Sequence, residues 1–251
     1  MTIILIFFIA HWYLSLFSQS FLTHRYASHG AFTMNKFWEK IFYIFAYITM
    51  GSTYMSPRTY AIMHRMHHAY TDTPLDPHSP NDSSNPFSMI WKTNKVYMSI
   101  FRNKMQVEER FTKNLPDWHW LDKLGHSRIS RILWSFLYIA FYIIFSPSPW
   151  FYFLIPIHIL MGPIHGVIIN WFAHKHFYVN FKLNNKSMNL FPIDLIMLGE
   201  AYHNNHHKFA SSSNFGVRWY EVDPVYLIIV FFNWLGIVRI NKMALNTSHS
   251  L

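Results

Sequence analysis

The feature that most restricts the fold of this chain is an uncharged apolar stretch at its start. Residues 2–22 (TIILIFFIAHWYLSLFSQSFL) contain no Lys, Arg, Asp or Glu, and a helix needs about 20 apolar residues to cross a bilayer. A secretory signal is the alternative interpretation, but the stretch lacks a basic beginning and a small-residue cleavage site. We therefore expect residues 2–22 to form a membrane-spanning helix that stays in the protein.

The composition supports a membrane protein that also has a polar part. Charged residues make up 13% of the chain, against about 25% in ordinary soluble proteins. The mean hydropathy of +0.08 is nevertheless too low for a chain made only of spanning helices. We attribute the net charge of +9 to the positive-inside bias, because no run of Lys and Arg is dense enough to predict a nucleic-acid partner. The absence of cysteine excludes disulfides, thiolate metal sites and a Cys nucleophile.

Three further apolar stretches follow, at residues 41–55, 132–172 and 224–238. The second is interrupted by SPSPW at residues 146–150, which predicts two helices joined by a Pro-rich turn. The stretches between these segments are polar, and the one that contains TDTPLDPHSPNDSSNP is rich in turn residues. The chain therefore alternates between segments suited to lipid and segments suited to water.

Four histidine-rich motifs lie in or beside the polar stretches. With 17 histidines in 251 residues, the pattern H-x-x-H-H is expected by chance far less than once, yet it occurs twice. Offsets of three and four bring side chains to one face of a helix. His24 and His29 are five apart and diverge by about 140° on a straight helix, so they reach a common centre only from its rim or ends. The motifs are HRYASH (24–29), HRMHH (64–68), NWFAH (170–174) and HNNHH (203–207).

Together the motifs offer nine imidazoles and one amide, which is too many for a single ion and suits two metal ions close together. Imidazole binds Fe, Zn, Cu or Ni, so the ligand type does not identify the metal. A two-zinc hydrolase would normally recruit bridging carboxylates, and the nearby acidic residues Asp72, Asp76 and Glu200 are few; redox chemistry is therefore favoured. The candidate ligands are His24, His29, His64, His67, His68, Asn170, His174, His203, His206 and His207.

Three other histidines, His11, His158 and His165, lie singly inside apolar segments. We expect them to be packed and hydrogen-bonded within the helical bundle. Lining of a substrate channel is the alternative, because polar side chains within a membrane face the bundle interior or a cavity.

The motifs also constrain the topology, because one shared site requires all of them on one side of the membrane. Residues 2–22 and the hairpin at 132–172 then cross, whereas residues 41–55 lie along the interface or re-enter. This predicts an all-α fold of about three transmembrane helices and interfacial helices, capped by a helical domain that holds the histidines, with residues 1–251 forming one domain. That side is expected to be cytoplasmic, because it carries the basic residues Arg25, Lys36, Lys40, Arg58 and Arg65.

In their order along the chain, these motifs resemble those of the membrane-bound fatty acyl desaturases, the family that includes stearoyl-CoA desaturase and bacterial acyl-CoA desaturases. The resemblance covers most of the chain. It includes HRYASH, HRMHH with the following DPH (76–78), NWFAH, GEAYHNNHH (199–207) and RWYEVDP (218–224).

The resemblance implies an oxidoreductase that inserts a cis double bond into a saturated acyl chain with molecular oxygen. It implies two iron ions held by the nine histidines, with Asn170 reaching a metal through water. It also implies a separate electron donor of the cytochrome or ferredoxin type and a bacterial inner-membrane location with the site on the cytoplasmic face. Larger relatives have a two-span hairpin before the first motif, whereas this chain is expected to begin at the second helix.

The acyl carrier stays open between CoA, a carrier protein and a lipid, because Ile62 and Met63 stand where CoA-using relatives often carry Arg and Asp. Lys92 and Lys95 are candidates to pair with phosphates. Tyr60 and Trp171 are candidate walls of a substrate tunnel, together with Trp12.

Two other functions stay open. A histidine-box hydroxylase or ketolase acting on an alkane, sterol or carotenoid is the closest alternative. Metal transport or sensing is the other, although transport needs ligands along a transmembrane path and these motifs gather at one face.

Overall fold

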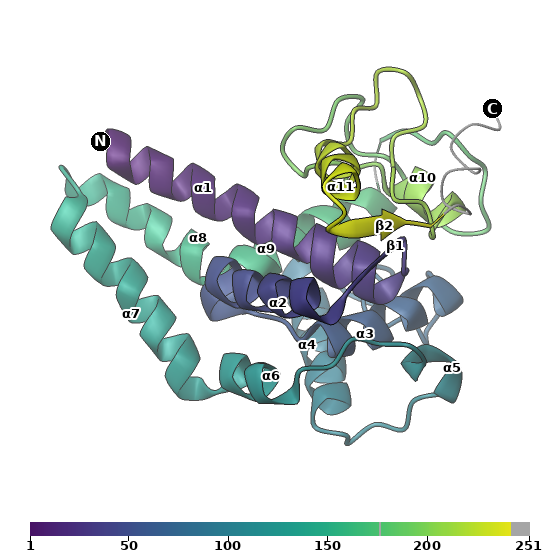
Figure 1. The fold of residues 1–251 in the computed structure, drawn as a ribbon, viewed down its shortest axis with the longest axis horizontal. Coiled ribbons are helices and arrows are strands. Elements are labelled where there is room, and N and C mark those ends of the chain that lie inside the picture. The colour runs from purple at the N-terminus through teal and green to yellow at the C-terminus, as the bar shows by residue number, and fades with distance from the viewer. Residues whose placement is uncertain (176, 242–251) are drawn as a thin grey trace.

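The computed structural model describes residues 1–175 and 177–241 (Figure 1). The regular secondary structure of the described chain is helical apart from two three-residue strands, which confirms the predicted all-α fold class. The elements in order are α1 (Thr2–Ser18), η1 (Gln19–Ser28), β1 (Phe32–Met34), α2 (Lys36–Met50), η2 (Gly51–Thr53), α3 (Pro57–Tyr70), α4 (Pro86–Phe101), α5 (Glu109–Thr112), α6 (His119–His126), α7 (Arg128–Phe145), η3 (Pro149–Leu154), α8 (Ile155–Ile159), α9 (Met161–Asn170), η4 (Phe172–His174), α10 (His203–Lys208), α11 (Pro224–Trp234) and β2 (Val238–Ile240).

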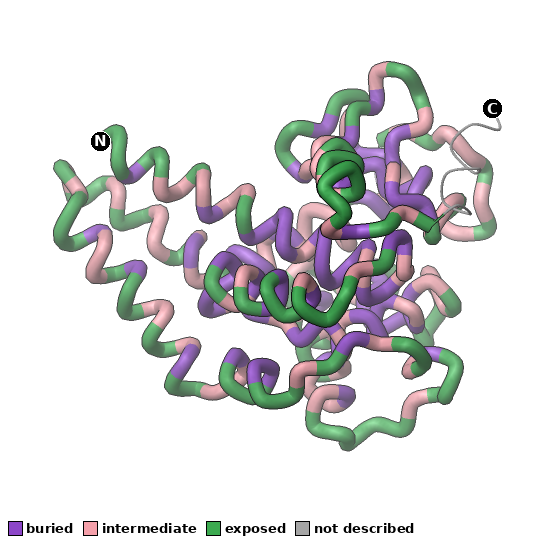
Figure 2. Tube along the Cα trace, viewed as in Figure 1, coloured by how far each residue is buried: buried purple, intermediate pink, exposed green. Residues whose placement is uncertain are grey.

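The candidate membrane spans are the long apolar helices at one end of the molecule. Thr2–Ser28 and Arg128–Phe145 are long and apolar enough to cross a bilayer, and Pro149–Ile159 with Met161–His174 forms a third span if this pair, bent by 67°, crosses once. Figure 1 shows α1, α7 and α8 extending together away from the other helices. Exposed and half-buried residues dominate this end in Figure 2, as lipid-facing helices require. These spans agree with the predicted three crossings.

Helix α2 occupies most of the apolar stretch that was expected to lie along the interface. It begins at Lys36 rather than at Ile41, because the side chain of Asn35 caps the helix by accepting a hydrogen bond from the Trp38 N–H. It packs against α1 and ends at Gly51, which has a φ of 52°. A Cβ at Gly51 would lie 1.8 Å from the Tyr138 hydroxyl, so only glycine fits this turn.

The core lies between η1, α2 and α11, where aromatic side chains such as Phe21 and Tyr43 are fully buried. The last apolar stretch contributes to it, because Val225 and Ile229 of α11 are also fully buried there. Beyond α11, β2 pairs antiparallel with β1, with Phe32 opposite Ile240. The sequence analysis did not anticipate this pair, since each strand has only three residues and no alternating pattern long enough to read.

Candidate metal centre

The first histidine motif is placed by an unusual continuation of α1. Residues Gln19–Ser28 form a π-helix, in which each N–H bonds to the carbonyl five residues earlier. The His29 N–H accordingly bonds to the His24 carbonyl, and the two imidazole centroids lie 5.1 Å apart. The divergence expected for a straight α-helix does not arise, because the wider π winding brings residues five apart to the same side and His29 is the cap residue at the end of η1.

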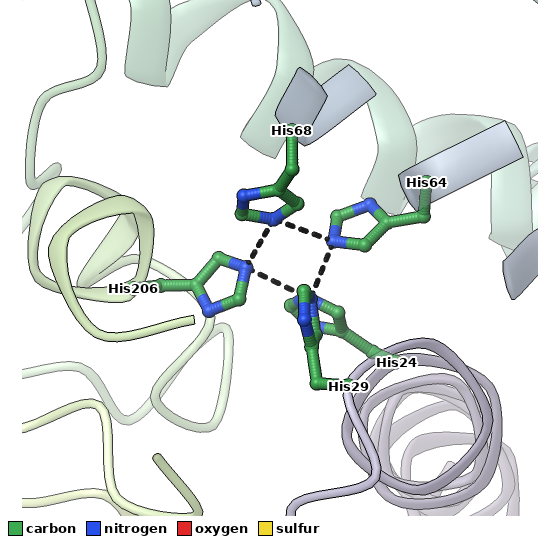
Figure 3. Close-up of side chains that lie close together, drawn as sticks. All are labelled: His24, His29, His64, His68 and His206. Carbon is green, nitrogen blue, oxygen red and sulfur yellow. Dashed lines mark hydrogen bonds between the residues drawn. The ribbon is translucent and has the colours of Figure 1, made fainter. Parts of the chain in front are cut away.

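The motifs on α3 and α10 complete two separate groups of imidazoles. Within each group the candidate ligand atoms lie within 4.8 Å of one another. The first histidine group is His24, His29, His64, His68 and His206, and the second histidine group is His67, His174, His203 and His207. Figure 3 shows the five rings of the first group pointing toward one centre from η1, α3 and α10. The structure thus brings together all nine predicted histidines, five in one group and four in the other.

The spacing of the ligand nitrogens suits the binding of a shared metal ion. In the first group, the Nε2 atom of His64 lies 2.9 Å from that of His29 and 3.0 Å from that of His68. In the second, the Nε2 atom of His203 lies 2.9 Å from that of His174 and 3.0 Å from that of His207. With metal–nitrogen bonds of about 2.1 Å, ligands at right angles are about 3.0 Å apart and tetrahedral ligands about 3.4 Å apart. The spacings of 2.9–3.2 Å are thus close to those expected between nitrogens that share one metal ion.

Carboxylates contact the Nδ1 atoms of three imidazoles, on the side of the ring opposite the metal-facing Nε2 atom, and so orient them. The Nδ1 atom of His24 lies 2.6 Å from Glu200 Oε2, that of His67 lies 3.0 Å from Asp76, and that of His174 lies 3.3 Å from Asp72. An imidazole that donates its Nδ1 proton to a carboxylate presents an unprotonated Nε2 to a metal. The sequence analysis noted only that acidic residues near the histidines are few and did not predict that they contact the imidazoles. For Asp76 and Glu200, the available signal was their place beside the histidines in DPH and GEAYHNNHH.

The electrostatics of the groups also favour a cation. Burial, followed by the neighbouring imidazoles, holds the pKa of His64, His68 and His206 well below the usual 6.5. Neutral imidazoles keep a lone pair on nitrogen, and lone pairs facing one another at 3 Å repel unless a proton or a cation lies between them. The donor set therefore fits two metal ions, one at each group, by its chemistry as well as its spacing.

An apolar cavity of about 380 Å³ lies beside the first histidine group, next to His64. Tyr60 lines it, and its ring stacks on that of His64 with centroids 5.5 Å apart. Asn170 also lines it. Its apolar wall includes Met55, Met63, Met89, Ile159, Leu160 and Pro163.

Lys92 and Lys95 lie on the exposed face of α4, at the mouth of an outer cavity of about 490 Å³. Lys92 donates a hydrogen bond to the Asp82 carbonyl, and Lys95 lies over the Trp91 ring. His78 lines both the outer and the apolar cavity. The cavity beside the two basic side chains and the apolar cavity thus share a lining residue.

The aromatic candidates differ in position. Trp171 packs under the ammonium of Lys175, 3.4 Å from its ring centroid, and is not among the described residues that line the apolar cavity. Trp12 donates a hydrogen bond to the Ile196 carbonyl and lies edge-on to His165. Of the three candidates only Tyr60 borders the apolar cavity.

Two of the isolated histidines are satisfied inside the helical bundle, as expected. The Nδ1 atoms of His11 and His158 lie 2.5 Å apart, and Tyr142 Oη lies 2.9 Å from His158 Nε2. Their polar atoms are therefore accounted for without a ligand.

A buried arginine that the sequence analysis counted only among the basic residues of one membrane side links η1 to the segment before α11, next to the first histidine group. Arg25 is fully buried and lies 2.9 Å from Asp223 and 3.6 Å from Glu200. Its guanidinium also stacks 4.0 Å from the Phe215 ring centroid. Glu200 therefore contacts both Arg25 and His24, which couples this ion pair to the candidate metal ligand.

The comparisons with known proteins agree with this geometry. The sequence model of the fatty acid desaturase family matches residues 1–230. The chain is 27% identical over 226 residues to the Acyl-CoA 5-desaturase AL21 of Anemone leveillei, covering 88% of this chain and 66% of that protein. It is 29% identical over 228 residues to the sn-1 stearoyl-lipid 9-desaturase of Synechocystis, covering 90% of this chain and 67% of that protein. The chain thus spans about two thirds of the length of these relatives.

Proposed function

Because the chain belongs to the fatty acid desaturase family, we propose that it is an oxygen-dependent diiron enzyme that introduces a cis double bond into a saturated fatty acyl chain. The observation that carries this proposal is the pair of histidine groups beside an apolar cavity. Removal of hydrogen from an unactivated methylene is beyond any protein side chain, and two irons with oxygen would supply that chemistry.

The residues of the chain have distinct tasks in this proposal. The first and second histidine groups would each hold one iron, with Asn170 acting through water. Glu200, Asp76 and Asp72 fix the orientation of His24, His67 and His174. The apolar cavity excludes water and holds one carbon pair of the acyl chain near the groups, because a methylene offers no polar handle for positioning.

We favour acyl-CoA as the substrate over an acyl lipid or an acyl carrier protein. Lys92 and Lys95 are exposed at the outer cavity, and ammonium groups there suit the phosphates of CoA. The relative from Anemone leveillei is named an acyl-CoA desaturase, and the relative from Synechocystis a stearoyl-lipid desaturase. Competition between the two substrate types in a membrane assay distinguishes them.

The proposed location is the bacterial inner membrane, with both histidine groups at its cytoplasmic face. The spans Thr2–Ser28 and Arg128–Phe145 support membrane insertion. The basic residues Lys36, Lys40, Arg58 and Arg65 lie on the same side of these spans as the histidine motifs, which is the positive-inside pattern.

The function is tested by expressing the chain in a bacterium that lacks an aerobic desaturase. We expect monounsaturated fatty acids in its membranes only when oxygen is supplied, measured by gas chromatography with mass spectrometry. An alcohol or ketone in place of the alkene would favour the hydroxylase or ketolase alternative. An unchanged lipid profile with a compatible electron donor present would contradict the proposal.

Electrons for this reaction must come from a separate protein, and we propose that it is acidic. All the exposed charged side chains between residues 177 and 220 are basic, namely Lys182, Lys186, Lys208 and Arg218. The acidic residues of this range, Asp194 and Glu200, are buried. Lys208 directly follows His207 of the second group, so an acidic cytochrome or ferredoxin that docks here would approach the proposed metals closely.

Charge reversal tests this basic surface. The triple variant Lys182→Glu, Lys208→Glu and Arg218→Glu should raise the KM for an acidic donor at least tenfold at low salt, because electrostatic steering mainly speeds encounter. Its metal content should equal that of the wild type. Lys123→Glu, an exposed lysine on α6, is the matched control. An unchanged donor KM in the triple variant would show that the donor docks elsewhere.

A further inference from the structure

A second, much smaller cavity lies directly between the two histidine groups and α9. Its volume is about 30 Å³, which is enough for one or two water-sized molecules. Members of both groups line it, His24 and His64 from the first and His203 from the second. It shares Gln19, Tyr60, Gly166 and Asn170 with the apolar cavity. The small cavity therefore connects the place proposed for the acyl chain with both groups.

Besides His64 of the first histidine group, whose Nδ1 atom is unpaired, two residues that line the small cavity carry buried polar atoms without a partner among the described residues. His165 is 1% exposed, and both of its ring nitrogens lack a hydrogen-bond partner among the described residues. Gln19 Oε1 is likewise buried and unpaired there. Buried polar groups are almost always hydrogen-bonded, because leaving them unpaired forfeits their hydration without replacement. The three unpaired atoms of His165 and Gln19 around one cavity indicate a ligand that would bind there.

The position of His165 does not follow from packing alone. Trp12 lies edge-on to the imidazole, with centroids 4.6 Å apart and planes at 88°, and so fixes the ring beside the cavity. The other membrane histidines, His11 and His158, satisfy one another in the same bundle. His165 is therefore a residue of α9 whose unpaired nitrogens a ligand in the small cavity would satisfy.

We propose that the small cavity binds one hydrogen-bonding ligand of one to three heavy atoms, held by His165 and Gln19 on one side and facing both histidine groups on the other. A neutral imidazole offers one donor and one acceptor, and Gln19 Oε1 adds an acceptor. Water fits this set in the resting protein, and azide is a probe of the same size class. The inference rests on the proposed function, since it assigns His165 and Gln19 as positioning residues for small ligands at that metal centre.

The first test measures azide binding to the iron-loaded, full-length protein by optical titration. His165→Phe removes both nitrogens and should raise the azide dissociation constant at least tenfold with the iron content unchanged. His165→Gln, which keeps a donor and an acceptor, should restore most of the affinity, and Gln19→Met should weaken binding in the same direction. His119→Phe, at an exposed histidine on α6, is the control. Wild-type azide affinity in His165→Phe would overturn the inference.

The second test does not depend on iron and so separates this inference from the proposed function. If the small cavity binds nothing, His165→Phe removes two unpaired buried groups and raises the Tm of the protein as purified. If a ligand is held there, the variant loses those hydrogen bonds, and the Tm falls by about 2–4 °C. A raised or unchanged Tm would overturn the inference. A wild-type chain that takes up no iron would instead refute the proposed function. The Tm comparison would still decide whether the small cavity binds a ligand.

Discussion

Replacing His67 with alanine will abolish desaturation and lower the metal content by about one ion per chain. His67 is fully buried, its Nδ1 atom lies 3.0 Å from Asp76, and its Nε2 atom lies 3.2 Å from that of His207. The second histidine group has only four members, so the loss of His67 leaves three imidazoles and removes the imidazole partner of the buried Asp76 carboxylate. Metal content by mass spectrometry and fatty acid composition by gas chromatography measure both effects in one preparation.

The control for this experiment is His119→Ala. His119 is exposed on α6 and belongs to neither histidine group, so its removal should leave both readouts at wild-type values. Asp76→Asn is an intermediate case, because loss of a carboxylate behind a ligating histidine typically costs 10–100-fold in metal affinity. Full activity of His67→Ala with two metals bound would contradict the assignment of the second group.

Replacing Asp223 with alanine is expected to have the largest effect on stability. The change leaves Arg25 fully buried without its nearest carboxylate, since Glu200 lies 3.6 Å away against 2.9 Å for Asp223. Breaking a buried ion pair by removing one partner costs about 3–5 kcal/mol of the free energy of unfolding. Asp223 also accepts hydrogen bonds from the N–H groups of Phe215 and Tyr226, so the start of α11 loses its cap as well.

Thermal unfolding in detergent measures the effect as a fall in Tm of roughly 10 °C for a chain of this size. Asp117→Ala, at an exposed aspartate in the polar part of the chain, is the matched control and should stay near the wild-type value. Metal affinity should also fall in Asp223→Ala, because Arg25 contacts the Glu200 that orients His24. Equal Tm values for the two variants would show that the Arg25 ion pair adds nothing to stability.

The sequence predicted that these histidines come together because the signal is local, and their role as metal ligands stays a prediction. Residues three and four apart meet on one side of a helix, so H-x-x-H-H on α3 and α10 was readable from spacing alone. The division of these histidines into two groups could not be predicted from spacing. In each motif the outer pair, His64 with His68 and His203 with His207, stays together, while the middle histidine joins the other group. That division depends on how α3 and α10 face one another.

The π-helical backbone that carries the first motif could also not be predicted from local spacing. A π-helix has no strong composition signature, and tertiary packing of η1 against α3 decides whether the backbone adopts it. Local reasoning also could not predict the carboxylate partners, because they lie far away in the sequence. Glu200 reaches His24 across 176 residues, and Asp223 reaches Arg25 across 198. Spacing patterns predict which residues share a helix face, but not which distant segments fold against that face.

The most direct test of the account is X-ray absorption spectroscopy of the purified, iron-loaded protein combined with metal quantification. The account predicts two irons per chain with nitrogen-dominated coordination, four to five imidazoles each, and metal–nitrogen distances of about 2.1 Å. One iron per chain, or a first shell dominated by carboxylate oxygen, would contradict it.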